Sequence, residues 1–404
     1  MKKKILFLEQ QSWLSGAQRV LESVLEATAE EYDPIVAFPD EGPFQRALAD
    51  RKIQTLTYPL GSYQTGQKSR AEMLDFAGRS LLCSFKLATL IRREEVGLVY
   101  INGPRCMPAG VLAAQLTRRP ALFHLHLTLV RKPEILLVAG LGRYVSTIVS
   151  CSRAAAAGIV SANRCLATKT HILYNPVAGR ADATKVLATP QPPAGNSSVL
   201  TIGVVGRITK PKGQRILLNA VGRLSAKNKA MVRVIFVGAP SPGNGEDLAY
   251  DQRLKECAAQ FCLETKTSWA GYQAVVGPFY RAMDVLVQPS LVDSGESMPL
   301  AVLEALQHGV PVIASWTGGI PEVIRHGSNG LLVPPGDEVA LARTLERFIQ
   351  DASLRARLCA GAQSGFDERF SLEAFKSRIR GLIWKLCTAQ HMGNTKTIHE
   401  ESVA

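Results

Sequence analysis

The chain has 404 residues, of which 46% are hydrophobic and 20% charged, a composition typical of a soluble globular protein with two domains of about 150–200 residues. Its formal net charge of +13 is concentrated in residues 1–180, which hold 23 basic and 14 acidic residues. Such basicity indicates an anionic membrane surface or a phosphorylated substrate. Because no dense Lys/Arg block with interleaved aromatic residues occurs, the sequence argues against nucleic acid as a partner.

The eight cysteines are scattered and include no C-x-x-C pair, which indicates a cytoplasmic protein rather than a disulfide framework. The apolar run near the start stops at Glu9 after four residues, which is too short for a signal peptide. The apolar stretch 135–149 is broken by Arg143 and is too short to span a bilayer. We therefore expect no targeting or membrane-spanning segment.

Short apolar runs alternate with helical segments through the first half of the chain. This alternation predicts an α/β fold with a parallel sheet and crossover helices on both faces. Strands are predicted at 5–8, 35–38, 54–58, 98–101, 121–126 and 147–150, and helices at 17–30, 71–93, 107–117, 133–143 and 153–161.

Two features of this half are candidates for ligand contact. Gly16 lies in a turn of small residues between the first strand and helix, where backbone N–H groups can approach a phosphate or a sugar; a plain tight turn explains it equally well. His124 and His126 face the same side of a strand and could bind a metal, but no third ligand is near. The preferred interpretation is a structural His124 and a cleft-facing His126, with no metal.

Basic residues gather at the helices and loops between 68 and 143. Most of them are expected to form a solvated face, but the cluster also predicts a surface that holds this domain against anionic lipid. They are Lys68, Arg70, Arg79, Lys86, Arg92, Arg93, Arg118, Arg119, Arg131, Lys132 and Arg143.

The stretch 181–198 is rich in Pro, Ala, Gly and Ser and predicts a linker between domains 1–180 and 199–370. A second alternating unit follows, with strands at 199–205, 232–238, 267–272, 284–288, 311–314 and 330–333 and helices at 214–224, 246–261, after 299, and over 337–389. The helix 371–389 is expected to cross back to the first domain, and the polar tail 390–404 to be disordered.

A glycine-flanked basic loop follows the first strand of the second unit. It carries Arg207, Lys210 and Lys212 at the carboxyl edge of the sheet, beside a helix N-terminus. Its spacing fits neither a Walker loop nor a dinucleotide-binding fingerprint. Arg can bridge two phosphate oxygens and Lys can supply a point charge, so the loop predicts a diphosphate site.

Two carboxylates, Glu296 and Glu304, flank the start of the predicted helix after 299. Eight positions at 100° per residue place them on one side of a helix, about 12 Å apart. That separation is too large for an acid–base pair acting on one glycosidic bond and suits two hydroxyl-rich ends of one extended ligand. Two solvated acids on an ordinary surface helix are the alternative.

Several segments of the second half share their order and spacing with a known family. They are GR-x4-KG (206–213), AGY (270–272), the QPS turn (288–290), E-x7-E (296–304), HG-x-PVIAS (308–315), GG-x-PE (318–322) and NGLLVPPGD (329–337). This pattern resembles retaining glycosyltransferases of the GT-B type, group 1, also called family 4. In the first half, 15–20 (SGAQRV) is similar to the GGAERV segment of that family.

The resemblance implies two Rossmann-like domains facing a cleft, with the acceptor on the first domain and the nucleotide sugar on the second. Its implied catalytic set is Glu296, Arg207, Lys212 and His126. The implied donor-binding set is Gly16, Gly206, Arg207, Lys212, Ser290, Glu296, Ser297, Met298, Pro299, Leu300 and Glu304. Ser297, Met298 and Pro299 stand where many members have Gly-Phe-Gly, and Pro299 has no N–H to donate.

The expected function is transfer of a hexose or N-acetylhexosamine from a nucleoside-diphosphate sugar to a glycan or lipid-linked glycan, with retention, in polysaccharide or glycoconjugate synthesis. No metal and no cofactor beyond this co-substrate are expected, because two cations and a helix N-terminus supply the positive charge. The expected location is the cytoplasm, with peripheral contact at the inner membrane face. The alternatives are a nucleotide-sugar 2-epimerase of similar fold and a non-catalytic partner in a polysaccharide assembly complex.

Overall fold

The structure, a computed structural model, describes residues 2–61, 69–177, 199–364 and 367–400. It divides into two compact units, unit 1 (Met1–Pro176 with Leu372–Ala404) and unit 2 (Val177–Ser371). Each unit has its own parallel sheet, so the predicted α/β class with two Rossmann-like domains is confirmed. The predicted linker 181–198 and Lys68 lie outside the described residues.

Unit 1 contains a seven-stranded parallel sheet in the order β3-β2-β1-β4-β5-β6-β7. The chain builds outward from β1 in one direction and then from β4 in the other, and ligands of such sheets bind at the carboxyl ends of the strands at this reversal. The strands are β1 (Lys3–Glu9), β2 (Tyr32–Phe38), β3 (Gln54–Thr57), β4 (Val96–Asn102), β5 (Ala121–Leu125), β6 (Thr147–Ser150) and β7 (Thr170–Ile172).

Helices cover both faces of this sheet, because successive strand residues point to opposite sides. Leu6 and Leu8 face a core shared with α3 to α6, whereas Ile5 and Phe7 face a core shared with α1, α2 and α15. The helices are α1 (Gly16–Thr28), α2 (Pro43–Asp50), α3 (Arg70–Arg93), α4 (Met107–Thr117), α5 (Lys132–Leu141), α6 (Arg153–Ala162) and α15 (Leu372–Glu400).

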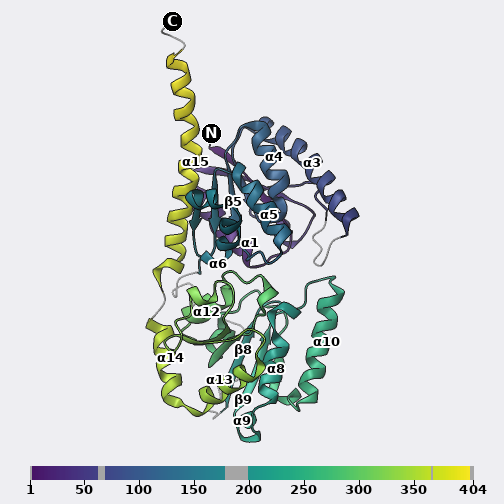
Figure 1. The fold of residues 1–404 in the computed structure, drawn as a ribbon, viewed down its shortest axis with the longest axis vertical. Coiled ribbons are helices and arrows are strands. Elements are labelled where there is room, and N and C mark those ends of the chain that lie inside the picture. The colour runs from purple at the N-terminus through teal and green to yellow at the C-terminus, as the bar shows by residue number, and fades with distance from the viewer. Residues whose placement is uncertain (1, 62–68, 178–198, 365–366, 401–404) are drawn as a thin grey trace. The chain divides into compact units, whose positions relative to one another are not determined.

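The C-terminal helix α15 belongs to unit 1 and runs alongside it in Figure 1. Phe375, Ile379 and Ile383 recur every four residues and are fully buried in the core shared with α1. The helix continues to Glu400, eleven residues past the predicted end at 389. No proline interrupts 372–400, and the residues after 389 are compatible with a helix.

Unit 2 contains a six-stranded parallel sheet in the order β10-β9-β8-β11-β12-β13, with the same reversal between β8 and β11. The strands are β8 (Leu200–Val205), β9 (Val232–Val237), β10 (Thr267–Trp269), β11 (Val285–Gln288), β12 (Val312–Ser315) and β13 (Gly330–Val333). The helices are α8 (Gln214–Gly222), α9 (Ala226–Ala230), α10 (Gly245–Gln260), α11 (Gly277–Arg281), α12 (Leu300–Gln307), α13 (Glu338–Gln350) and α14 (Ala352–Ser364).

The structure also contains elements that the sequence did not predict. It adds β7, α2, α9 and α11, whose sequences are too short and too mixed to show a period. It also ends β10 at Trp269 instead of residue 272. Gly271 adopts a φ of +67°, which lies outside the extended region and stops the strand.

Candidate functional site

The loops after β8 and β11 meet at the carboxyl edge of the unit 2 sheet. The Lys212 side chain, in the short 3-10 turn η4 (Lys210–Lys212), forms an ion pair with Glu296 from the loop after β11. The Leu291 N–H also donates to the Pro211 carbonyl at 2.9 Å and joins the two loops. The structure therefore brings together one cation and one acid that the sequence predicted for the same site.

Gly213 makes this close approach possible. Its φ of +71° lies in the left-handed region, and a Cβ atom there would lie 1.9 Å from the Pro289 carbonyl oxygen. Only glycine satisfies both conditions. Gly318, from the loop after β12, packs in the same way on the Glu296 main chain, with a φ of +54° and a Cβ position 1.7 Å from the Glu296 carbonyl oxygen. The Glu296 backbone is thus held by its neighbours.

Glu296 is 7% exposed, and its carboxylate is held by more than the ion pair. Ser290 Oγ donates to Glu296 Oε1 at 3.2 Å, and Gln288 Nε2 in turn donates to Ser290 Oγ at 2.8 Å. The sequence marked Ser290 through the turn that contains it, but it did not assign Gln288 a role. A buried carboxylate with fixed donors keeps one orientation toward a ligand.

Glu304 lies on α12, where the Tyr280 hydroxyl donates to its Oε2 at 2.7 Å. Tyr280 comes from α11, is fully buried and packs its ring against His308. The sequence gave no signal for this contact because α11 has only five residues and shows no period. Tyr280 orients the carboxylate that the resemblance assigns to the ribose.

The helical-wheel argument for the two acids is wrong. Helix α12 begins only at Leu300, with Pro299 as its N-cap, so Glu296 precedes the helix and no helical period relates it to Glu304. Glu304 lies one turn inside the helix rather than two. Pro299, with a φ of −67° and a ψ of +121°, has an extended backbone and separates Glu296 from the helix.

The start of α12 supplies main-chain donors at the same edge. The N–H groups of Leu300 and Ala301 lie in the first turn, where a helix offers no internal acceptor, and they bond no acceptor among the described residues. Ser297, Met298 and Pro299 are buried just before them. A helix N-terminus of this kind attracts anions.

Arg207 and Gly206 lie in the loop directly after β8. Gly206 has a φ of +144°, and its carbonyl oxygen lies 1.9 Å from where a Cβ of Gly238 would stand, so two glycines pack there. The Arg207 side chain is exposed and has no ion-pair partner among the described residues. Its carbonyl accepts from Gln214 Nε2 at 2.7 Å, which fixes the backbone but leaves the guanidinium at the surface.

In unit 1 the predicted residues lie at the carboxyl ends of β1, β4 and β5. Gly16 is the first residue of α1, after Ser15, whose N–H donates to Gln18 Oε1 at 3.1 Å. His126 directly follows β5, and its Nε2 lies 2.7 Å from Asn102 Oδ1 at the end of β4. Asn102 Nδ2 donates to Glu9 Oε2 at 2.7 Å, so Glu9 extends this site in a way that the sequence did not reveal.

The two histidines lie close together but differ in surroundings. Their ring centroids are 3.8 Å apart. His124 is fully buried, and its Nδ1 hydrogen-bonds the Tyr100 hydroxyl, whereas His126 is partly exposed. Burial lowers the pKa of His126 to about 3 and the pKa of His124 well below its usual range, so both rings are neutral near pH 7.

Burial raises the pKa of Glu9, whereas it lowers the pKa values of the two histidines. Its side chain is fully buried, which raises its pKa to about 7 against the lowering effect of hydrogen bonds from the Gln10 N–H and Asn102. Within the described residues, no group of three or more His, Cys, Asp and Glu side chains forms a metal site. The site of unit 1 is therefore a network of neutral rings and amides around one titratable carboxyl group.

Two family models match the chain, one in each half. Residues 14–178 match Glycosyltransferase Family 4, and residues 199–351 match Glycosyl transferases group 1. The second match contains the Lys212–Glu296 pair and the whole of α12. The first begins two residues before Gly16 and includes His126.

Named relatives and solved structures are similar to this chain. The D-inositol 3-phosphate glycosyltransferase of Stackebrandtia nassauensis is 36% identical over 170 residues, which are 40% of this chain and 37% of the relative. The lipopolysaccharide core biosynthesis glycosyltransferase LpsE of Rhizobium meliloti is 31% identical over 170 residues, 42% of this chain and 45% of the relative. The chain thus spans about two fifths of the length of these curated relatives.

Structural similarity extends over nearly the whole chain. The crystal structure of Anabaena HepE in complex with UDP superposes with a TM-score of 0.76 at 23% sequence identity and covers 95% of this chain and 100% of HepE. The same protein has been solved with UDP-glucose. At this identity the similarity establishes the fold.

Proposed function

The chain belongs to the group 1, or family 4, glycosyltransferases, and we propose that it moves a hexose or N-acetylhexosamine from a nucleoside-diphosphate sugar to a glycan or lipid-linked glycan, with retention of anomeric configuration. The observation that carries this proposal is the Lys212–Glu296 ion pair beside the N-terminus of α12. A cation, an oriented acid and main-chain donors together match a diphosphate joined to a sugar.

Each part of the donor has a candidate partner in unit 2. Lys212 and the exposed Arg207 bind the diphosphate and offset the negative charge that develops on the leaving group. Glu296 and the main chain at 297–300 bind the sugar hydroxyls. Glu304, oriented by Tyr280, accepts from the ribose hydroxyls.

The proposed reaction retains the anomeric configuration and needs no metal ion. Two cations and a helix N-terminus supply the positive charge that a divalent ion supplies in other transferases. We assign no protein nucleophile, because Glu296 is already engaged by Lys212 and Ser290. Same-face attack by the acceptor hydroxyl within one ion-pair-like transition state gives retention without a covalent intermediate.

The donor base is tested by a thermal-shift panel of UDP, GDP, ADP and their sugars. A ligand at 100 times its Kd stabilises the folded state by about 2.7 kcal/mol, which raises the melting temperature measurably. UDP is the first candidate, because HepE has been solved with UDP and with UDP-glucose. A protein that none of the nucleotides stabilises would contradict the proposal and favour a non-catalytic partner, and formation of an epimer from a UDP-sugar alone would favour a 2-epimerase.

The acceptor side of the proposal includes peripheral contact with an anionic membrane. On α3 the buried residues Cys83, Leu87 and Ile91 face the core, and Leu74, Leu82 and Phe85 lie on the opposite side with 74%, 51% and 55% of their surface exposed. Leu136 and Leu137 of α5 are similarly exposed. The two helices cover the same face of the sheet, and apolar side chains that face water there mark an interaction surface.

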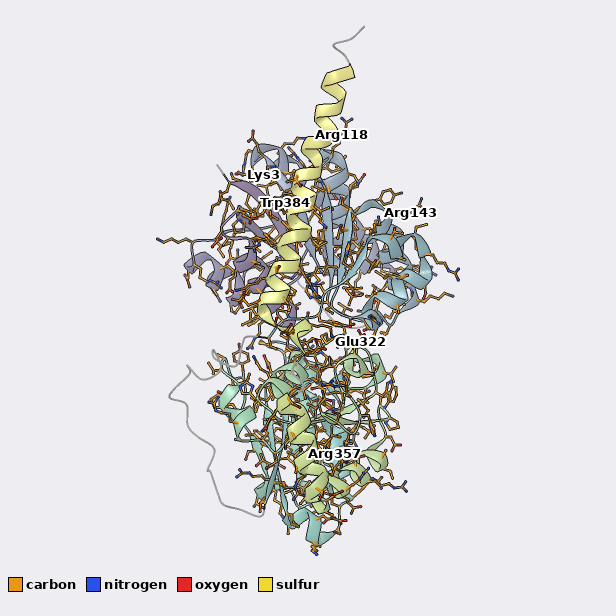
Figure 2. The ribbon with its side chains drawn as sticks, turned by 90° about the vertical axis from the view of Figure 1, so that its left-hand side faces the viewer. Lys3, Arg118, Arg143, Glu322, Arg357 and Trp384 are labelled. Atoms are coloured by element: carbon orange, nitrogen blue, oxygen red, sulfur yellow. The ribbon has the colours of Figure 1, made fainter. Side chains whose placement is uncertain are left out.

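The charge around these helices favours lipid over protein as the occupant. Residues 69–146 hold eleven basic and five acidic residues, and Arg118 and Arg143, labelled in Figure 2, are exposed there. Each basic residue near an anionic surface contributes about 1 kcal/mol. None of the helices in the described segments has the length and apolar character needed to cross a bilayer. All eight cysteines are free, which supports the cytoplasmic leaflet.

Flotation with phosphatidylcholine vesicles, with and without phosphatidylglycerol, tests this surface. We expect binding to the anionic vesicles at low salt, loss at high salt, and at least tenfold weaker binding for the double variant Leu82→Gln, Phe85→Gln. Leu248→Gln changes an equally exposed leucine of unit 2 and serves as the control. Equal binding of all three proteins, or no binding of the unmodified protein at low salt, would refute the membrane contact.

A further inference from the structure

Three side chains form a linear hydrogen-bonded chain at the carboxyl ends of adjacent strands in unit 1. Glu9 ends β1, Asn102 ends β4 and His126 follows β5, and the register pairs Glu9 with Asn102 across the sheet. Asn102 Nδ2 lies 2.7 Å from Glu9 Oε2, and Asn102 Oδ1 lies 2.7 Å from His126 Nε2. Each member therefore constrains the hydrogen positions of the next.

The direction of these bonds follows from the chemistry of the carboxylate. An ionised Glu9 only accepts hydrogen bonds, and its other oxygen already accepts from the Gln10 N–H at 2.8 Å. Asn102 must then point its NH2 group at Glu9 and its carbonyl oxygen at His126. A carbonyl oxygen only accepts, so the hydrogen of the neutral imidazole lies on Nε2 and its lone pair on Nδ1.

We propose that Glu9 is a positioning residue, which acts through Asn102 to hold His126 in the tautomer that carries hydrogen on Nε2 and its lone pair on Nδ1. This tautomer follows from hydrogen bonds within unit 1 and does not rest on the proposed function.

The same chain couples the tautomer to the proton of Glu9. A protonated Glu9 can donate to Asn102 Oδ1, which reverses the amide, and the Asn102 NH2 group then requires His126 Nε2 to accept. Burial raises the pKa of Glu9 to about 7, so this reversal falls near neutral pH. Hydrogen bonds from the Gln10 N–H and Asn102 lower this pKa.

The other titratable groups around Glu9 do not change charge in this range. The Tyr58 hydroxyl donates to the Glu9 carbonyl, and burial raises the pKa values of Tyr58, Tyr100 and Cys106 above their usual ranges. The pKa of His124 is lowered, mainly by burial. Arg105, the neighbouring cation, donates to the carbonyls of Gln10, Leu60 and Gly61.

The variant Glu9→Gln tests the assignment because it forces the reversal. The Gln10 N–H still donates to the side chain at position 9, so the amide oxygen of the new glutamine faces Gln10 and its NH2 group faces Asn102. Asn102 must then turn its carbonyl oxygen toward this NH2 group and its own NH2 group toward His126. We expect two-bond ¹H–¹⁵N spectra of histidine-labelled protein at pH 8.5 to show the Nε2–H form of His126 in the unmodified protein and the Nδ1–H form in Glu9→Gln. His126→Gln identifies the signals, and Glu134→Gln on α5 is the matched surface control.

An unmodified protein in the Nδ1–H form at pH 8.5, or a Glu9→Gln variant that keeps the Nε2–H form, overturns the proposal. If Glu9→Gln does not fold, the unmodified protein at pH 5.5 replaces it: a change to the Nδ1–H form supports the proposal and an unchanged tautomer refutes it.

Discussion

Lys212 and Glu296 are separated by 84 residues in sequence, yet they form one ion pair. The Glu296 side chain is 6% exposed and the Lys212 side chain 25% exposed, so the pair lies between a surface and a buried salt bridge. Its net contribution to stability is small in such a position, because desolvation offsets much of the attraction. Its main effect is to hold a cation in one orientation at the sheet edge.

The variant Lys212→Ala is expected to weaken nucleoside-diphosphate binding at least tenfold, because it removes a charge that we propose binds the diphosphate. It should also destabilise the protein by about 1–3 kcal/mol, since it leaves a buried carboxylate without its cation. Titration calorimetry and urea unfolding measure the two effects. Lys210→Ala removes an exposed neighbouring cation, and an equal loss of affinity in both variants would contradict a specific role for Lys212.

The raised pKa of Glu9 predicts that the stability of the folded protein falls as the pH rises through 7. Its folded pKa of about 7 lies above its ordinary value of 4.5, so between these pH values the folded protein holds a proton that the unfolded chain has lost. This stabilisation is complete below about pH 4.5 and is lost as the pH rises through 7.

Between pH 5 and pH 8 the unmodified protein should therefore lose stability relative to Glu9→Gln, on the order of 3 kcal/mol for the full shift. Urea unfolding of both proteins over this range measures the difference. The surface variant Glu134→Gln should show a constant difference from the unmodified protein. A Glu9→Gln difference that is also constant with pH would show that Glu9 has an ordinary pKa.

At the scale of elements, short turns rather than helices bring the unit 2 site together. The turn η4 ends at Gly213, and this glycine lets the loop after β8 contact the loop after β11. The N-terminus of α12 adds main-chain donors because that helix begins directly after its N-cap, Pro299. Glycine and proline therefore decide the position of the charged residues beside them.

Alanine substitutions at two glycines with nearly equal φ values distinguish the effect of backbone strain from the effect of steric crowding. Gly213 and Gly243 have φ values of +71° and +72°, but a Cβ would collide with Pro289 at Gly213 and meets nothing within 4 Å at Gly243. Gly243→Ala should lower the free energy of unfolding by about 1 kcal/mol, because alanine is strained in the left-handed conformation. Gly213→Ala should lower the free energy of unfolding by about 2 kcal/mol more than Gly243→Ala, because its Cβ also collides with Pro289, and it should weaken nucleotide binding. Equal unfolding free energies for the two variants would show that the loops do not make this contact.

At the scale of the whole molecule, the chain crosses from unit 1 to unit 2 and returns through α15. Unit 1 is therefore complete only when the last helix has been made, because α15 fills the face of the sheet next to α1. Lys376 also pairs with Glu26 of α1 at 3.1 Å. The C-terminal helix is a structural part of the unit that carries His126.

This dependence predicts the effect of changes in α15. Ile379→Ala creates a cavity in the core of unit 1 and should destabilise that unit by about 2–4 kcal/mol. Trp384→Ala, at the 55% exposed residue labelled in Figure 2, should change stability by less than about 1 kcal/mol. Differential scanning calorimetry of the two variants measures both effects, and equal effects would mean that α15 does not form part of the core.

The sequence by itself determined the α/β class, most strands and long helices, and the family, because hydrophobic periodicity and motif spacing are local properties of the chain. It also identified Arg207, Lys212, Glu296 and Glu304 as candidates. Only the tertiary structure decided which of them touch: it pairs Lys212 with Glu296 and leaves Arg207 exposed. It also revealed Tyr280 behind Glu304 and Glu9 behind His126. These partners come from different elements, and strand order, register and turn geometry bring them together, which no local pattern in the sequence encodes.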